Sequence, residues 1–146
     1  MLFRSVGTRG ITEGLAAAMQ YDPEGDVDAN TSAMRAAAGS VVSGEITVAV
    51  RESTCEAGPI AKGDHLGLTR DGGIVVVAGS LPEAATALLA KLIDDDHEIV
   101  TIIEGQGASA ASTRTITEWL ADQQPGVTAE VHHGGQPLYP YLFGIE

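Results

Sequence analysis

The sequence predicts an α/β fold in which a mixed sheet of six strands is covered by helices on one face. Ile46, Val48 and Val50 alternate with Thr47, Ala49 and Arg51, which is the period of a half-buried strand. Asp71-Gly72-Gly73 separates apolar runs at 66–69 and 74–77, which predicts a hairpin and antiparallel neighbours. Further along, strand, helix, strand, helix and strand patterns follow one another, and such connections favour parallel neighbours. A mixed sheet satisfies both requirements.

The composition limits the possible classes of protein. The chain has 146 residues, 44% of them hydrophobic, which fits one domain with one core. The net charge of −12 argues against nucleic acid and anionic membranes as partners, and favours a basic partner protein or simply solubility. One cysteine, no signal-peptide pattern and no membrane-spanning run lead us to expect a cytoplasmic protein without membrane insertion.

The N-terminal part, residues 1–43, is expected to be a helical segment that packs on or leads into a domain at 44–146. Residues 11–20 are alanine-rich and predict a short helix. Asp26 or Asp28 can cap a second helix that ends near Gly39. This second helix could instead be a linker to a preceding domain, and the sequence leaves both alternatives open.

The middle of the chain contains the clearest helix. Residues 52–64 are expected to form a loop. Ser80 followed three residues later by Glu83 predicts a capping box at the start of a helix that ends near Asp94. Its buried stripe is expected to consist of Leu81, Ala85, Leu88, Leu89 and Leu92.

The remaining elements alternate between strand and helix. Residues 98–103 are almost continuously apolar, which predicts a central strand. Residues 109–122 predict an amphipathic helix that buries Ile116, Trp119 and Leu120, and residues 127–132 predict a half-exposed strand.

The last thirteen residues form the most informative segment. They are mostly apolar and contain three glycines, two prolines and three aromatic side chains, which predicts a buried final strand entered through a fixed turn. A strand carrying Pro140 should lie at a sheet edge or begin there. The segment offers a rigid surface, to which we assign structure first and partner contact second. Its key residues are Gly134, Gly135, Gln136, Pro137, Tyr139, Pro140 and Tyr141.

Acidic side chains are dense around Asp94, Asp95 and Asp96, with Glu98 close by. One interpretation is a solvated helix end, and the other is a docking patch that raises the association rate with a basic partner. The spaced ligands and central glycine of a calcium loop are absent from this run.

Patterns that would indicate catalysis are weak. Gly105-Gln106-Gly107 lies between a strand and a helix, but Ala110 stands where a dinucleotide loop needs its third glycine. His132 and His133 are adjacent on a strand and point to opposite faces, so they make a poor metal site. Cys55 lies near carboxylates, whose negative charge disfavours a thiolate anion, so a catalytic cysteine is not expected here. We therefore expect no catalytic residue, metal ligand or cofactor in this chain.

Four blocks of sequence, taken in order, closely resemble the C-terminal region of the catalytic polypeptide of bacterial fatty acid kinase, which is a dihydroxyacetone-kinase-like protein. The blocks are residues 44–51, 62–64, 95–105 and 134–141, of which the last is the most specific. The resemblance implies a two-layer α/β sandwich like the second subdomain of DegV-like proteins. It also implies that ATP and magnesium bind on a kinase domain that this sequence lacks.

The resemblance further implies a docking role. The family's C-terminal region binds a separate DegV-like fatty-acid carrier through an acidic surface, and works with the kinase and middle domains. We expect Asp94, Asp95, Asp96 and Glu98 to make that contact, with Glu104 a weaker candidate. The alternative is a small-molecule or fatty-acid-binding domain, with its pocket between the sheet and its helices.

Overall fold

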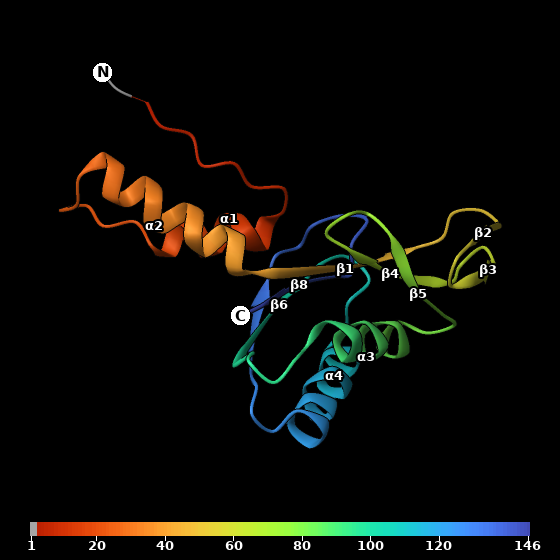
Figure 1. Ribbon diagram of the computed structural model, residues 1–146. Coiled ribbons are helices and arrows are strands. Elements are labelled where there is room, and N and C mark those ends of the chain that lie inside the picture. The colour runs from red at the N-terminus through yellow and green to blue at the C-terminus, as the bar shows by residue number, and fades with distance from the viewer. Residues whose placement is uncertain (1–2) are drawn as a thin grey trace.

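A computed structural model describes residues 3–146, which form four helices and eight strands (Figure 1). The helices are α1 (Ile11–Met19), α2 (Val27–Ser40), α3 (Leu81–Leu92) and α4 (Ala110–Gln123). The strands are β1 (Val42–Val48), β2 (Ser53–Cys55), β3 (Gly58–Ile60), β4 (His65–Thr69), β5 (Ile74–Ala78), β6 (Ile99–Glu104), β7 (Thr128–His133) and β8 (Tyr141–Ile145).

Six strands form one mixed sheet in the order β5-β4-β1-β8-β6-β7. Only β6 and β7 pair in parallel within it; the other four neighbouring pairs are antiparallel. Helices α3 and α4 cover one face of this sheet, and the predicted two-layer α/β fold is thereby confirmed (Figure 1). The final strand, β8, is buried along its whole length between β1 and β6, and it begins directly after Pro140, as expected.

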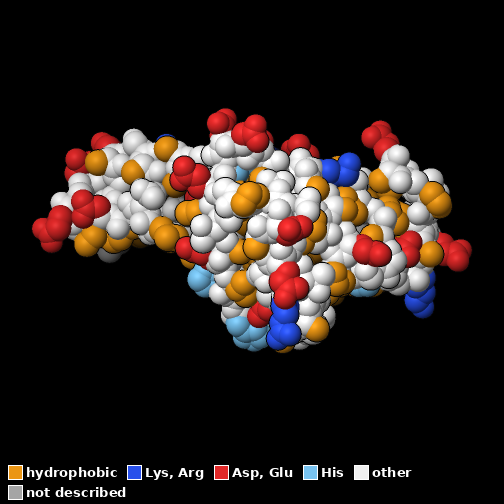
Figure 2. Space-filling model, turned by 90° about the horizontal axis from the view of Figure 1, so that it is seen from below, with side chains coloured by type: hydrophobic (Ala, Val, Ile, Leu, Met, Phe, Trp, Pro, Cys, Tyr) orange, Lys and Arg blue, Asp and Glu red, His pale blue; other side chains and the backbone are white. Residues whose placement is uncertain are grey.

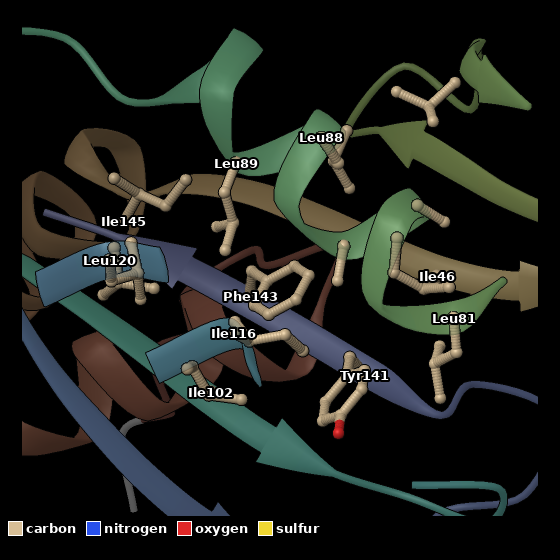
Figure 3. Close-up of a cluster of buried hydrophobic side chains, with 14 residues drawn as sticks. Ile46, Leu81, Leu88, Leu89, Ile102, Ile116, Leu120, Tyr141, Phe143 and Ile145 are labelled. Atoms are coloured by element: carbon tan, nitrogen blue, oxygen red, sulfur yellow. The ribbon is translucent and has the colours of Figure 1, made fainter. Parts of the chain in front are cut away.

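The core lies between the sheet and helices α3 and α4 (Figure 3). Tyr141 and Phe143 of β8 supply its aromatic part, with ring centroids 5.8 Å apart and nearly parallel planes. The predicted stripe of α3 is buried here except for Leu92, which is half-buried, and Trp119 of α4 packs at the margin. The fully buried aliphatic side chains include Ile46, Leu88, Leu89, Val100, Ile102, Ile116, Leu120 and Ile145.

Helix α1 contacts the other face of the sheet, and α2 packs against α1 (Figure 1). The Thr12 and Ser43 hydroxyls lie 3.0 Å apart and form a buried hydrogen bond between α1 and β1. Of the two aspartates that the sequence offered as caps for α2, Asp26 is the N-cap, and its carboxylate accepts a hydrogen bond from the Ala29 N–H at 2.8 Å.

Two local predictions were wrong. The expected loop at 52–64 contains the short β2–β3 hairpin, whose three-residue strands are too brief to leave a periodic pattern. Ser80 occupies the N-cap of α3, but its side chain makes no capping hydrogen bond. The capping box belongs instead to α4, where Ser109 and Ser112 bond to each other's backbone N–H groups.

Candidate functional site

The predicted acidic residues 94–96 form the turn between α3 and β6. All three aspartates are exposed, but they do not have equal roles. The Asp94 carboxylate accepts a hydrogen bond from the Asp96 N–H at 3.0 Å, and the Asp94 N–H donates to His97 Nδ1 at 3.0 Å. Asp94 therefore builds the turn, in the manner usual for aspartate. Asp95 and Asp96 present carboxylates that this turn does not need.

A fifth acidic residue, Glu146, lies beside Glu98, which follows the three aspartates, and the sequence did not predict it. Glu98 is exposed just before β6, and its N–H donates to the Glu146 carbonyl oxygen at 2.7 Å. Glu146 is itself exposed. We call Asp94, Asp95, Asp96, Glu98 and Glu146 the acidic end. Only the antiparallel pairing of β8 with β6 brings Glu146 there, so no pattern in the sequence could have found it.

Glu104 does not belong to the acidic end. It is the last residue of β6, whereas Glu98 precedes the first. Six residues of extended chain separate the two by about 20 Å. The Glu104 side chain is only 22% exposed and accepts a short hydrogen bond from the Thr113 hydroxyl. The structure thus separates Glu104 from the other candidate residues and gives it a local partner.

Glu104 ends a buried chain of hydroxyl groups that links β6, α4 and β8. The Tyr141 hydroxyl lies 2.7 Å from Ser112 Oγ and 2.7 Å from Thr113 Oγ1. The protons can be assigned so that Ser112 donates to Tyr141, Tyr141 to Thr113 and Thr113 to the Glu104 carboxylate. Each hydroxyl then donates once, and bonds arranged head to tail strengthen one another. Figure 3 shows the Tyr141 ring in the core with its oxygen at the edge of the cluster.

The terminal motif, residues 134–141, is fixed by its own hydrogen bonds. The N–H groups of Gly134 and Gly135 both donate to the Glu104 carbonyl oxygen, at 2.8 and 2.9 Å. The Gln136 side chain donates to the carbonyl oxygens of Ile103 and Tyr139, at 3.2 and 3.1 Å. These bonds hold the segment against the carboxyl end of β6.

The same contacts explain the glycine after β6. A Cβ atom at Gly105 would lie 2.2 Å from the Tyr139 carbonyl oxygen, so no side chain fits there. The Gly105 N–H donates to the Pro140 carbonyl oxygen at 2.8 Å. Close approach of the terminal motif, not a bound phosphate, accounts for glycine at this position.

Leu138 of the terminal motif was not singled out in the sequence. Its φ of +70° is the one positive value among the non-glycine residues that the structure describes, and its side chain is 75% exposed. The Thr47 hydroxyl donates to its carbonyl oxygen at 2.9 Å and helps to hold this conformation. The segment therefore presents an exposed leucine from a fixed backbone.

Negative charge is not confined to the acidic end. Figure 2 shows Asp and Glu side chains on several parts of one face, including the far tip of the α1–α2 region. Among residues 3–146, no group of three or more His, Cys, Asp or Glu side chains is arranged to hold a metal ion, and no helix is long and apolar enough to cross a bilayer. A test of the acidic end must therefore be compared with an equal charge change elsewhere.

The space between the sheet and α3 and α4, where the fatty-acid-binding alternative required a pocket, is filled by core side chains. A hollow of about 500 Å³ lies on the other face, between residues 8–14 and the sheet. Glu45 of β1 lines this hollow beside Tyr139 and Leu142. Partial burial raises the pKa of the Glu45 carboxyl above its ordinary value.

Comparison with known proteins assigns this fold to a class. The family model for the FakA-like C-terminal region of fatty acid kinase matches residues 4–146. The chain therefore belongs to this family of kinase-associated C-terminal regions.

Particular relatives are much longer than this chain. Uncharacterized proteins of Staphylococcus epidermidis and Staphylococcus haemolyticus are each 38% identical to it over 141 residues, and one of Staphylococcus aureus is 37% identical over the same length. The matches cover 97% of this chain but 25%, 25% and 26% of the respective relatives. The chain thus spans about a quarter of the length of these relatives.

Proposed function

We propose that this chain is the docking region of a fatty acid kinase. In this proposal it carries no catalytic group of its own and holds no cofactor. It binds a DegV-like fatty-acid carrier in the cytoplasm, so that a kinase domain elsewhere can phosphorylate the acyl group with ATP and magnesium. The observation that carries the proposal is the family match over residues 4–146.

The acidic end is the surface that we assign to the carrier. Asp95, Asp96 and Glu98 are exposed and close together, and the backbone beneath them is held by the β6–β8 ladder. Clustered surface charge of one sign accelerates encounter with a partner of the other sign, and salt weakens the effect because it screens exposed charges. A basic patch on the carrier is the complementary surface.

Charge reversal tests this assignment. The variant Asp95→Lys/Asp96→Lys keeps Asp94, which builds the turn. Exposed ion pairs contribute about 0.2–1 kcal/mol each, so replacing two attractions with two repulsions should cost about 1–4 kcal/mol, or roughly fivefold to 1,000-fold in Kd. The measurement is calorimetric titration with the carrier at low salt. Unchanged affinity would reject the acidic end as the docking surface.

The matched control is Glu52→Lys/Glu56→Lys. These exposed carboxylates lie in the β2–β3 region, and the substitutions change the net charge by the same amount. If the control weakens binding as much as the test variant, carrier affinity depends on the net charge of the chain and not on the acidic end in particular. A carrier that binds this control normally, and the test variant weakly, supports the assignment.

A further inference from the structure

We infer that one side of α1, together with the sheet surface beside it, is the contact surface for the polypeptide that precedes this region in its longer relatives. This inference is independent of carrier docking. It begins from the distribution of exposed apolar side chains. Ten large hydrophobic residues are exposed among those that the structure describes, and six of them lie within residues 3–27.

Three of the six form a stripe on α1. Ile11, Leu15 and Met19 follow one another at intervals of four residues, so they lie on one side of the helix. They are 58%, 40% and 74% exposed. Scattered single apolar residues on a surface need no explanation, but a continuous row of three on one short helix indicates a contact surface.

Helix α1 cannot turn to bury this stripe, because Thr12 and Glu13 already fix the helix against β1 and the β4–β5 turn. Thr12 is hydrogen-bonded to Ser43 of β1. Glu13 is 1% exposed, and its carboxylate pairs with Arg70 Nε at 3.0 Å in the β4–β5 turn. Arg70 is partly exposed, but the Glu13 carboxylate is buried and would be left uncompensated without it, so rotation of α1 would be opposed. The stripe is therefore held outward.

The stripe borders two hollows on the sheet face that α3 and α4 leave free. Leu15 and Met19 line a small cavity of about 20 Å³ with Thr101 of β6 and Gly144 of β8. Ile11 lines the hollow of about 500 Å³ with Leu142 of β8. Together α1 and the neighbouring strands make a trough, which we define by Ile11, Leu15, Met19, Thr101 and Leu142. Its α1 side is apolar, whereas Arg9, Glu45 and Gln136 also border the larger hollow.

The length of the relatives indicates what covers the trough. About three quarters of each relative lies outside the matched region, and the matching family is described as C-terminal. That additional polypeptide therefore precedes α1, the first helix of the matched region. Covalent attachment in one chain gives two segments a high effective concentration, so even a modest apolar surface can support contact.

Thiol labelling tests the inference in a full-length chain. The full-length chain is a chimera in which this sequence replaces the matched region of the Staphylococcus epidermidis relative. Cys55→Ser removes the native thiol of this sequence, and exposed cysteines in the rest of the relative are also replaced. Met19→Cys reports on the trough. Val50→Cys is the matched control, because Val50 is 82% exposed and lies outside the trough. Labelling rates are compared between the full-length chain and the 146-residue chain alone.

We expect Met19→Cys to react at least tenfold more slowly in the full-length chain, and Val50→Cys to react equally in both. Leu15→Cys repeats the measurement if Met19→Cys does not fold. Equal rates for both trough positions in the two chains would overturn the inference. Protection that grows with the concentration of the short chain would also overturn it, because a second copy would then cover the trough. Protection that appears only on adding the carrier would overturn it in favour of carrier binding there.

Discussion

The hydroxyl of Tyr141 gives the sharpest prediction about stability. Tyr141→Phe removes one buried oxygen and leaves the ring that stacks on Phe143. Ser112 Oγ can then donate to the Ser109 carbonyl oxygen at 3.0 Å, so it keeps a partner. Thr113 still donates to Glu104 but loses the hydrogen bond that it accepted. One buried hydrogen-bond partner is lost, which costs about 1–2 kcal/mol.

Urea unfolding measures this cost. The slope of the unfolding free energy against urea concentration should not change, because the variant should leave the compactness of the folded and unfolded states unchanged. Tyr139→Phe is the matched control, because Tyr139 contributes its backbone carbonyl to the motif's hydrogen bonds. We expect that control to change stability by less than about 0.5 kcal/mol. A Tyr141→Phe variant as stable as the control would refute the proposed chain of hydroxyl groups.

Two further predictions concern a helix cap and a titrating carboxyl. Ser109→Ala should lower the free energy of unfolding by about 1 kcal/mol and Ser80→Ala by much less, because of these two serines only Ser109 makes a capping hydrogen bond. Equal decreases in melting temperature for the two variants would contradict this. The raised pKa of Glu45 means that the folded state disfavours ionisation of this carboxyl. Stability therefore falls as the pH rises from the pKa of Glu45 in the unfolded chain through its higher pKa in the folded protein. Glu45→Gln should therefore raise the melting temperature at pH 7 and leave it unchanged near pH 3, whereas a loss of stability at pH 7 would show that the carboxylate is well solvated or paired.

The fold was predictable where the chain repeats a period. Strong patterns predicted the α3 stripe, the β4–β5 hairpin and the interior strand β6, because burial selects apolar residues at fixed intervals. Short or irregular features were missed. The β2–β3 strands have three residues each, and Ser109 caps through Ser112, which the usual serine–glutamate pattern does not describe.

The candidate site was predictable only where it is local in sequence. Asp95 and Asp96 are neighbours, so their density was visible directly. Glu146 lies near them only because β8 pairs with β6. Glu104 lies far from them because it stands at the opposite end of strand β6. Ile11, Leu15 and Met19 follow one another at helical spacing, which does not by itself say whether the stripe is buried or exposed. Their exposure follows from how Thr12 and Glu13 anchor α1, which depends on partners far along the chain.

Backbone amide NMR spectra recorded with and without the fatty-acid carrier test the docking account most directly. Addition of the carrier should shift the amide signals of residues 95–98 and Glu146, which surround the acidic end. The shifts should diminish as salt is raised, because the charges involved are exposed. Shifts confined to the β2–β3 hairpin or to α1, with the acidic end unchanged, would contradict the account.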